Sequence, residues 1–526
     1  MYEEEFTHQP YIPWKVFDEL RNEGNCRYGN VETWSRIRSR ISARFFGKVE
    51  LPDPTPVGVS REIERSRFGD VLVYLAKKKI SNGMTPTPSL IRNTVPKTHH
   101  IRINGNEEHI RDSQHTPLYG GGASYHSFTE ALSKSIGELL ERHVLATPFF
   151  NQKNKIIRRT FGDTKIPPAL LHEIPRFFDW QKKYVPNGLT SGVLKKKEIK
   201  NTPVHCIEGQ SLSTGKKISL PLQHVQWGLP YSGTYGPDPY IFSPRTTNGA
   251  GGGFSLTEAA LSGICELIER DGFLIYWLNR LSPRQICIDQ HNSGKLSQRF
   301  LEIYGSLLDR GYEIYFLDTT SDIRVPSATC LIRTPLTDGR ISISVTGKCH
   351  PDPHHVLEGA LLEHIAFLSS PYKELPLFVF DEERAAFSDR NIGKDERVNL
   401  WRSGKIANKI LFFLSGEKIS FEQWASGFPS IPSNHKAALT RVLSEFIRME
   451  KESGRAYEVF CHEASNPVLG DLNYHVVKVI IPALMPLYLR ESDALLDCVR
   501  LREVPGKLGY TAVPIDAYNP IPHPFP

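Results

Sequence analysis

The sequence predicts a mixed α/β (α+β) fold that is organised around a duplicated, glutamate-rich helix. A helix-like segment at residues 127–143 recurs at residues 255–271, at a constant offset of 128 residues. Runs rich in β-branched and aromatic residues lie between and after the two copies and are typical of strands. With 526 residues, of which 40% are hydrophobic, the chain is long enough to bury a large core. We therefore expect pseudo-duplicated mixed sheets that carry two acidic helices.

The two copies of the repeat read SFTEALSKSIGELLERH and SLTEAALSGICELIERD, and nine of their seventeen positions are identical. Each copy follows a cluster of glycines. Each begins with a Ser-x-x-Glu capping box, from Ser127 to Glu130 in the first copy and from Ser255 to Glu258 in the second. Each unit is therefore predicted to be a glycine loop that leads into a helix.

Local patterns predict the remaining elements. Five strands are expected at residues 312–317, 328–333, 341–345, 457–461 and 476–481. Two further helices are expected at 356–368 and at 436–452, the second capped by Gly454. Residues 1–60 are expected to form an N-terminal lead-in to one domain that spans 61–526. Within this domain, the polar and proline-containing segments near 151–200 and 375–430 are expected to be peripheral insertions.

Composition and charge exclude several classes of protein. No stretch approaches the roughly 20 apolar residues of a membrane span, and the acidic start lacks the basic and apolar regions of a signal peptide. The net charge is only +6, and the few basic clusters contain little aromatic interleaving, which argues against nucleic acid binding. The eight cysteines form no Cys-x-x-Cys pair and are expected to be free buried thiols. We expect a cytoplasmic protein that binds neither membranes nor nucleic acid.

The glutamates of the repeat share one helical face. At 3.6 residues per turn, Glu258, Glu266 and Glu269 lie within about 80° of one another around the helix. The first copy places its equivalents in the same way: Glu130, Glu138 and Glu141. For any single Glu-x-x-Glu, the simplest interpretation is a solvated face that pairs with neighbouring basic side chains. If the two copies pack together, however, their carboxylates converge on a site that requires cations, and hard oxygen ligands of this kind suit Mg2+ bound to phosphates.

Two other motifs are weaker candidates for a ligand site. The stretch GQSLSTGK at 209–216 has one residue too many between its glycines for a P-loop and continues with Lys217 where Ser or Thr is needed. The cluster CHPDPHH at 349–355 has zinc-binding residue types, but adjacent Cys and His side chains point to different sides of an element. Neither motif displaces the acidic helices as the expected site.

The acidic stretches resemble the YcaO family, whose nucleotide site is built from two glutamate-rich helices rather than a P-loop. The matching stretches are GELLER at 137–142, NGAGGGFSLTEAALSGICELIERDG at 248–272 and TGKCHPDPHHVLEGALLEHI at 346–365. The resemblance runs from about residue 60 to the C-terminus. It implies a fold in which the acidic helices form an ATP site.

Carried over position by position, the resemblance implies a set of ATP-binding residues: Glu138, Glu141, Asn248, Glu258, Glu266, Glu269, Arg270 and Glu363. Within this set it assigns Mg2+ to Glu138, Glu141, Glu266 and Glu269. The chain departs from the family at two positions, because Phe254 stands where many members have Asn and Gly359 stands where an Arg four residues before Glu363 is expected. Lys77–Lys79 are candidates for a nucleotide contact near the start of the domain.

The C-terminal tail, residues 518–526, contains alternating prolines at 520, 522, 524 and 526. From physical chemistry alone it is an extended, polyproline-like segment whose end is expected to be loose. It is also similar to the Pro-x-Pro-x-Pro terminus of YcaO members that form azolines in ribosomal peptides, where the tail reaches toward the active site. That similarity makes Pro522, Pro524 and Pro526 the candidate catalytic residues.

The resemblance implies an ATP-dependent cyclodehydratase that converts Cys, Ser or Thr of a ribosomal precursor peptide into thiazoline or oxazoline, as in the biosynthesis of thiazole/oxazole-modified peptides and bacteriocins. Thioamidation, macroamidine formation and a non-catalytic peptide-binding scaffold are the alternatives. The implied partners are the precursor peptide, a leader-binding protein that resembles a ubiquitin-activating enzyme, and a flavin-dependent dehydrogenase, within a homodimer or hetero-oligomer. No region shows clear signs of the leader-binding domain, so we expect a separate protein to supply it.

Overall fold

The computed structural model describes residues 156–172, 200–226, 246–289, 296–309, 311–336, 338–368, 392–464 and 474–526. It also describes Gln181, Ser243, Phe387 and seven helical residues between 134 and 145. Before these lie four short strands, β1 (Leu72–Leu75), β2 (Lys77–Lys78), β3 (Thr87–Pro88) and β4 (Gly121–Ser124). β1 pairs with β4 and β2 with β3. The predicted lead-in at 1–60 and Glu130 lie outside the described residues.

One sheet of the described chain has six strands in the order β5-β6-β14-β15-β8, with β7 beside β6, and its pairs are antiparallel. Its strands are β5 (Ile157–Thr160), β6 (Pro203–Ser211), β7 (Lys217–Pro221), β8 (Ala250–Gly253), β14 (Phe460–Ala464) and β15 (His475–Ile480). The short helices α6 (Pro168–His172) and α9 (Leu222–Val225) belong to the same part of the chain. β14 and β15 confirm two of the predicted strands, although β14 begins three residues later than expected.

The second sheet has the order β12-β11-β10-β9-β13. Its strands are β9 (Gln285–Cys287), β10 (Glu313–Asp318), β11 (Ser327–Pro335), β12 (Ile341–Cys349) and β13 (Lys418–Ser420). All neighbours are antiparallel except β13, which runs parallel to β9. β12 continues to Cys349, four residues beyond its predicted end, and therefore brings Gly347 and Lys348 into the sheet.

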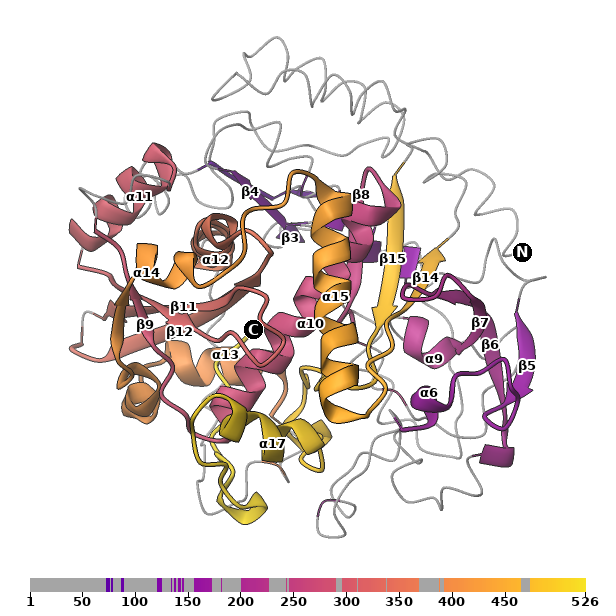
Figure 1. Ribbon diagram of the computed structural model, residues 1–526. Helices are drawn as coiled ribbons and strands as arrows, with labels where there is room; N and C mark the ends of the chain where they lie inside the picture. Colours follow the sequence, from indigo (N-terminus) through magenta and orange to yellow (C-terminus); the bar gives the residue numbers. More distant parts are fainter. Residues whose placement is uncertain are drawn as a thin grey trace.

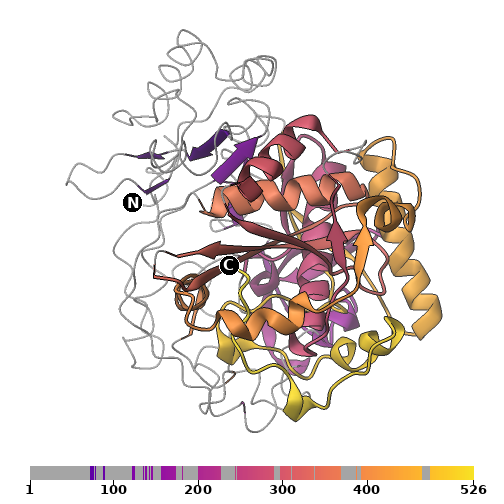
Figure 2. The same cartoon turned by 90° about the vertical axis from the view of Figure 1, so that its left-hand side faces the viewer.

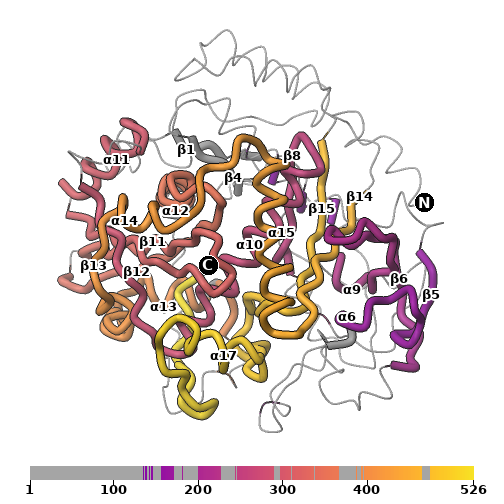
Figure 3. Tube along the Cα trace, in the orientation of Figure 1, coloured from indigo at the N-terminus to yellow at the C-terminus, as the bar shows by residue number. Residues whose placement is uncertain are grey.

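Helix α10 (Leu256–Leu278), which contains the second copy of the repeat, lies between the two sheets (Figure 1). It packs on β8 and β15 on one side, on β11 and β12 on the other, and against α15 (His435–Ser453). The tube view shows α10 and α15 side by side between the sheets (Figure 3). Because neighbours surround it, α10 is buried on nearly every side and does not present one apolar face only.

The other helices lie against the second sheet or belong to the C-terminal region. α12 (Pro353–Leu368) lies on β11 and β12 (Figure 2). The remaining helices are α11 (Gln298–Asp309), α13 (Lys394–Arg402), α14 (Phe421–Ser426) and α17 (Val499–Lys507), with 3-10 turns at 407–414, 491–493 and 515–517. α15 begins after the N-cap Asn434 and ends at Gly454, whose φ of 67° gives the left-handed cap that the sequence predicts.

From residue 392 onward, the segment predicted as the second peripheral insertion is part of the core. Its strand β13 joins the second sheet, and Trp401, Phe413 and Trp424 are at most 1% exposed. The prediction of a peripheral segment was wrong here because each short element buries only one or two large side chains. Buried residues that are so few in each element do not repeat at a helical or strand period, so the sequence gives no sign that the segment is buried. In the first predicted insertion, residues 157–160 form β5 at an edge of the six-stranded sheet, and Phe161 and Leu170 are buried.

Candidate functional site

α10 begins beside the glycine strand β8, and the two elements touch through their backbones. The Ser255 Oγ accepts a hydrogen bond from the Glu258 amide at 3.1 Å, as an N-cap should. The Glu258 carboxylate accepts the amide of Phe254 at 2.9 Å rather than that of Ser255, so the second half of the predicted capping box is shifted by one residue. A Cβ at Gly251 would lie 2.2 Å from the carbonyl oxygen of Ala259. Glycine is therefore required for this close approach.

The second copy of the repeat holds its glutamates at the glycine loop. Glu266 accepts the amide of Gly249 at 2.6 Å and a hydrogen bond from Arg270 at 3.3 Å. The side chain of Glu269 is only 8% exposed, and its Oε1 lies 3.6 Å from Arg270 Nε. Burial raises the pKa of Glu269 to about 8; Arg270 opposes this rise and the charge of Glu363 adds to it. Glu269 therefore takes up a proton more readily than a solvated glutamate.

The first copy of the repeat forms the same ion pair one helical turn apart. Arg142 contacts Glu138 at 2.5 Å, as Arg270 contacts Glu266. Burial raises the pKa of Glu141 to about 8, and the charges of Glu138 and Glu266 contribute to that rise. Because Glu141 and Glu266 belong to different copies, this interaction shows that the two acidic faces meet. The Glu–Arg ion pairs expected of a solvated helix face are therefore present. The face itself is partly buried, because Glu141 is partly shielded from solvent.

Tyr474 fills the space between the two copies. A Cβ at Gly137 would lie 2.6 Å from its hydroxyl oxygen and a Cβ at Gly252 would lie 2.4 Å from it, so the phenol sits between the first helix and β8. Its ring contacts Phe254 edge-on, with the ring centroids 5.3 Å apart. Burial and the charge of Glu141 raise the pKa of Tyr474 well above its ordinary value. Sequence reasoning missed Tyr474 because a single aromatic residue before a strand has no pattern that singles it out.

Glu363, from α12, is the third acidic group of the site. Its side chain is 49% exposed, and Lys348 of β12 contacts it at 2.5 Å. Its charge contributes to the raised pKa of Glu269, so the carboxylates of α10 and α12 lie near enough for their charges to interact. Sequence comparison singled out Glu363 but did not identify its lysine partner.

Asn248 anchors the glycine loop. Its side-chain amide donates to the carbonyl of Leu487 at 2.7 Å, and its backbone oxygen accepts Lys478 Nζ at 2.6 Å. Lys478 is only 4% exposed and also donates to the Thr246 carbonyl at 2.6 Å. Sequence reasoning missed this lysine, although a lone Lys in the apolar strand β15 was a usable signal, because a buried ammonium needs acceptors.

The C-terminal tail is docked on α10 rather than loose. The indole N–H of Trp277 donates to the Ile521 carbonyl at 3.1 Å, and that of Trp401 donates to the Pro522 carbonyl at 2.8 Å. The candidate prolines are enclosed to different degrees, since Pro522 and Pro524 are buried and Pro526 is half-buried. The C-terminus consequently lies near the centre of the molecule in both ribbon views (Figures 1 and 2). The loose end expected from physical chemistry alone is not observed, and the tail is docked as the family resemblance implies, because indole donors and apolar contacts offset its ordering entropy.

The end of the tail reaches the acidic face. The guanidinium of Arg270 lies over the ring of Phe525, with Cζ 4.5 Å from the ring centroid. Phe525 is 3% exposed and also packs on Phe273, one turn along α10. Arg270 therefore contacts the glutamates and the tail at once.

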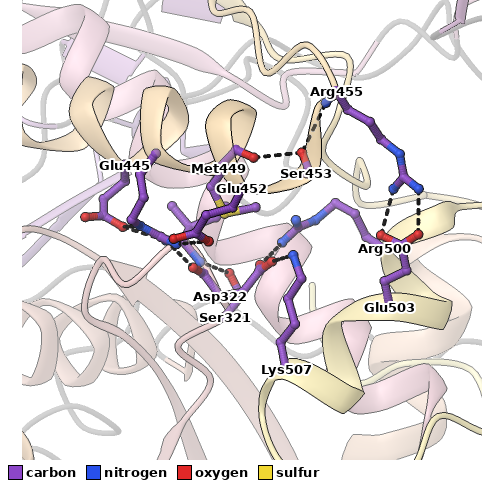
Figure 4. Close-up of polar contacts among 12 residues, drawn as sticks. Ser321, Asp322, Glu445, Met449, Glu452, Ser453, Arg455, Arg500, Glu503 and Lys507 are labelled. Carbon is purple, nitrogen blue, oxygen red and sulfur yellow. Dashed lines mark hydrogen bonds and ion pairs between the residues drawn. The ribbon is translucent and has the colours of Figure 1, made fainter.

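A buried network of ion pairs joins α10 to α17. Arg500 of α17 makes three hydrogen bonds to the carboxylate of Asp271, at 2.8, 3.0 and 2.7 Å, and another to Asp322 at 2.8 Å. Lys507 contacts the second oxygen of Asp322 at 2.9 Å (Figure 4). Because Asp271 follows Arg270 directly, this network fixes the helix turn that carries the site.

Comparison with known proteins identifies the family. The family model described as "YcaO cyclodehydratase, ATP- and Mg2+-binding" matches residues 119–485, which is more than half of the chain. The chain belongs to the YcaO family. The matched range contains all the acidic residues assigned above, from Glu138 to Glu363.

Two solved YcaO-like structures share the fold. A structure described as "Heterocyclase in complex with substrate and Cofactor" matches with a TM-score of 0.57 and 20% identity, covering 77% of this chain and 50% of that one. The heterocyclase TruD matches with a TM-score of 0.52 and 18% identity, covering 94% of this chain and 65% of that one. At these identities the likeness concerns the fold.

A curated relative from Rhizobium leguminosarum bv. trifolii, named "Uncharacterized protein in tfuA 3'region", is 27% identical over 172 residues, which is 32% of this chain and 39% of that protein. The chain thus spans about half of the heterocyclase chain and less than half of this relative.

The residues of the site fit Mg2+ and ATP. The acidic groups offer only carboxylate oxygens, the donors that Mg2+ prefers. Arg270 Nε is buried and has no hydrogen-bond acceptor in the described structure, so it remains able to donate to an anion. Among the residues described, no three His, Cys, Asp or Glu side chains come close enough together to form a metal cluster. Mg2+ usually needs only one or two carboxylates when phosphates and water complete its shell.

The competing motifs have structural roles. Residues 209–216 form the end of β6 and the turn into β7, which confirms that they are not a P-loop. In the 349–355 cluster, Cys349 is 2% exposed while His354 pairs with Asp352 at 2.9 Å. The seven described cysteines are free, as predicted, but Cys287 is exposed because it ends the short strand β9. No helix in the part of the chain described is long and apolar enough to cross a membrane.

Proposed function

We propose that this chain is an ATP-dependent cyclodehydratase that forms thiazolines or oxazolines from Cys, Ser or Thr of a ribosomal precursor peptide. The observation that carries the proposal is the contact of Phe525 with Arg270, because it joins a proline-rich tail to the acidic face of a YcaO site. A tail with this composition and position is expected in the azoline-forming branch of the family.

The proposed roles divide the site into three parts. ATP supplies the phosphoryl group that makes the peptide oxygen a leaving group, and Mg2+ offsets the charge of the phosphates. We propose that Mg2+ draws one or two carboxylates at a time from the two copies, namely from Glu138, Glu141, Glu266 and Glu269, while phosphates and water complete its shell. Glu258, Glu363 and Arg270 complete the nucleotide site, and Asn248 positions the glycine loop from behind. The tail, with Pro522, Pro524 and Pro526, orients the peptide, which is the main task of a protein in this chemistry.

The test is a mass measurement on a candidate precursor peptide mixed with the purified chain, ATP and Mg2+. Azoline formation removes one water, about 18 Da, for each Cys, Ser or Thr converted, and fragment masses place the loss at that residue. A sulfur-for-oxygen exchange indicates thioamidation, and a water loss in which an amine of the peptide condenses with a backbone amide carbonyl to close a ring indicates a macroamidine. Peptide binding without any ATP-dependent mass change indicates a scaffold and contradicts the proposal.

We further propose that the chain acts with a separate leader-binding protein and with a flavin-dependent dehydrogenase that oxidises the rings. This assignment of partners rests on the family resemblance of the sequence. Addition of the leader-binding protein should raise the rate of modification of a full-length precursor but not of a leaderless one. Rapid modification of the full-length precursor by this chain alone argues against the need for such a partner.

A further inference from the structure

The third acidic helix obtains its cation from a neighbouring strand. In both copies of the repeat, the glutamate has an Arg four residues later in the same helix: Glu138 with Arg142 and Glu266 with Arg270. α12 contains no Lys or Arg. Its Glu363 instead contacts Lys348, which lies on β12.

Lys348 occupies the space that a side chain at position 359 would fill. A Cβ at Gly359 would lie 3.1 Å from Lys348 Cγ and 3.3 Å from both Cδ and Cε, so the aliphatic part of the lysine crosses the backbone of α12 at this point. The Nζ then reaches Glu363 Oε1 at 2.5 Å, and the side chain stays 30% exposed. The absence of a side chain on Gly359 therefore leaves room for the aliphatic part of Lys348 to pass close to α12 on its way to Glu363.

The residue before Lys348 admits the buried carboxylate in the same way. A Cβ at Gly347 would lie 3.0 Å from the carboxyl carbon of Glu269. Gly347 on β12 thus leaves room for Glu269, and Gly359 on α12 leaves room for Lys348. The charges of both Arg270 and Lys348 act on Glu269.

The lysine stays charged in this position. Burial by itself would lower the pKa of Lys348, but the charges of Glu363 and Glu269 raise it well above its ordinary value. A protonated ammonium on a side chain that is 30% exposed lies beside the candidate carboxylates, and lysine is a common point-charge ligand of phosphate.

We propose that Lys348 is a phosphate-binding residue of the nucleotide site, which supplies from β12 the cation that the family resemblance leads one to expect at position 359. This inference rests on the proposed function, because it assumes that the acidic site binds Mg2+ and ATP. It adds a second phosphate cation to Arg270. It also explains how the chain tolerates glycine at position 359.

The first test measures binding of Mg2+ with a non-hydrolysable ATP analogue to the full chain by calorimetry. Lys348→Met should bind the nucleotide about ten- to a hundredfold more weakly, which is the effect of losing one hydrogen bond between charged groups. The matched control is Lys217→Met, which removes an exposed lysine that contacts Glu208 at 3.0 Å on β6 and should leave the affinity unchanged. Lys348→Gln serves as a second variant if Lys348→Met does not show the thermal unfolding midpoint of a folded chain.

A second measurement separates phosphate binding from simple neutralisation of Glu363. If Lys348 only offsets the charge of Glu363, then Lys348→Met has no further effect in a Glu363→Gln background. If Lys348 binds phosphate, the double variant binds the analogue at least about tenfold more weakly than Glu363→Gln alone. Additive loss supports the assignment, and equal affinities of these two variants overturn it.

Binding of Mg2+ and the analogue by the unsubstituted chain distinguishes failure of the proposed function from failure of the Lys348 assignment. If it does not bind Mg2+ and the analogue at all, the proposed function is wrong. If it binds them and folded Lys348→Met binds them equally well, only the role of Lys348 is wrong.

Discussion

Arg270 stacks on Phe525, with its Cζ 4.5 Å from the centroid of the ring. The same guanidinium donates to Glu266 at 3.3 Å. A cation–π contact of this kind contributes about 0.5–2 kcal/mol. The position of the C-terminal tail and the arrangement of the acidic face are therefore linked through one side chain.

Replacement of Phe525 by Leu should impair the proposed ring formation more than nucleotide binding. Leucine retains apolar packing on Phe273 but removes the aromatic face beneath Arg270. We expect dehydration of the peptide to fall about tenfold and the Kd for Mg2+ and ATP to change less than about threefold, since the proposed role of the tail is to orient the peptide. Parallel mass and calorimetric measurements check this. Unchanged dehydration contradicts a role of the tail in positioning.

Truncation after Asn519 is a harsher test of the same tail. It removes the carbonyl acceptors of Trp277 and Trp401 and uncovers the buried Ile521 site. We expect a lower thermal unfolding midpoint as well as loss of ring formation, because buried indole N–H groups without acceptors are costly. Differential scanning calorimetry checks the first effect. An unchanged midpoint shows that the tail is not docked in solution.

Glu266→Gln should abolish Mg2+-dependent ATP turnover while the fold is retained. The amide can still accept from the Gly249 amide, so the loop contact survives, but the charge offered to the metal is lost. We expect at least about a hundredfold loss in rate, since one proposed metal ligand is removed. The matched control is Glu463→Gln, an exposed glutamate that contacts His475. Normal ATP turnover by folded Glu266→Gln is incompatible with the metal assignment.

Affinity for Mg2+ and ATP should rise between pH 6 and pH 8. The pKa values of Glu141 and Glu269 are both raised to about 8, so these groups are largely protonated at pH 7, whereas a carboxylate that binds Mg2+ is ionised. Binding therefore releases protons and should level off above about pH 8. Calorimetry in two buffers of different ionisation enthalpy measures the release, which should be smaller in Glu269→Gln. Affinity that is constant from pH 6 to pH 9 contradicts the prediction.

The same pKa shifts act in the opposite direction on the stability of the chain without ligand. From the ordinary value of 4.5 up to about 8, the folded state keeps protons that the unfolded chain has released. Stability should therefore fall as the pH rises through this window. Chemical denaturation at pH 5 and pH 8, compared with Glu269→Gln, measures this contribution.

Arg500→Met should destabilise the chain by about 3–5 kcal/mol, because it leaves the fully buried Asp271 without its partner. The control is Arg455→Met. Arg455 makes a two-pronged pair with Glu503 on the surface, where both side chains are more than 40% exposed (Figure 4). Loss of that pair should cost less than about 1 kcal/mol. Equal effects of the two substitutions in denaturant titrations contradict the proposed role of the buried network.

Local patterns were sufficient where neighbours along the chain decide the structure. The Ser255 cap and the left-handed Gly454 follow from side-chain chemistry within a few residues, whereas the glycines predicted as a loop before α10 form the strand β8 because they pair with the distant β15. The 128-residue repeat likewise predicted the matched pairs of Glu138 with Arg142 and Glu266 with Arg270, because helical spacing brings residues four apart together.

The sequence by itself determined the repeat, the five strands that correspond to β10, β11, β12, β14 and β15, the helices α10, α12 and α15, and the family resemblance with its candidate carboxylates. Only the tertiary structure decided how Lys348 crosses Gly359, how Phe525 lies under Arg270, and how Lys478 and Asn248 hold the glycine loop. These contacts join residues that are far apart in the chain. Their energy depends on burial, available space and the direction of approach. None of these leaves a period or a motif in the sequence, so they emerge only when the two sheets enclose α10.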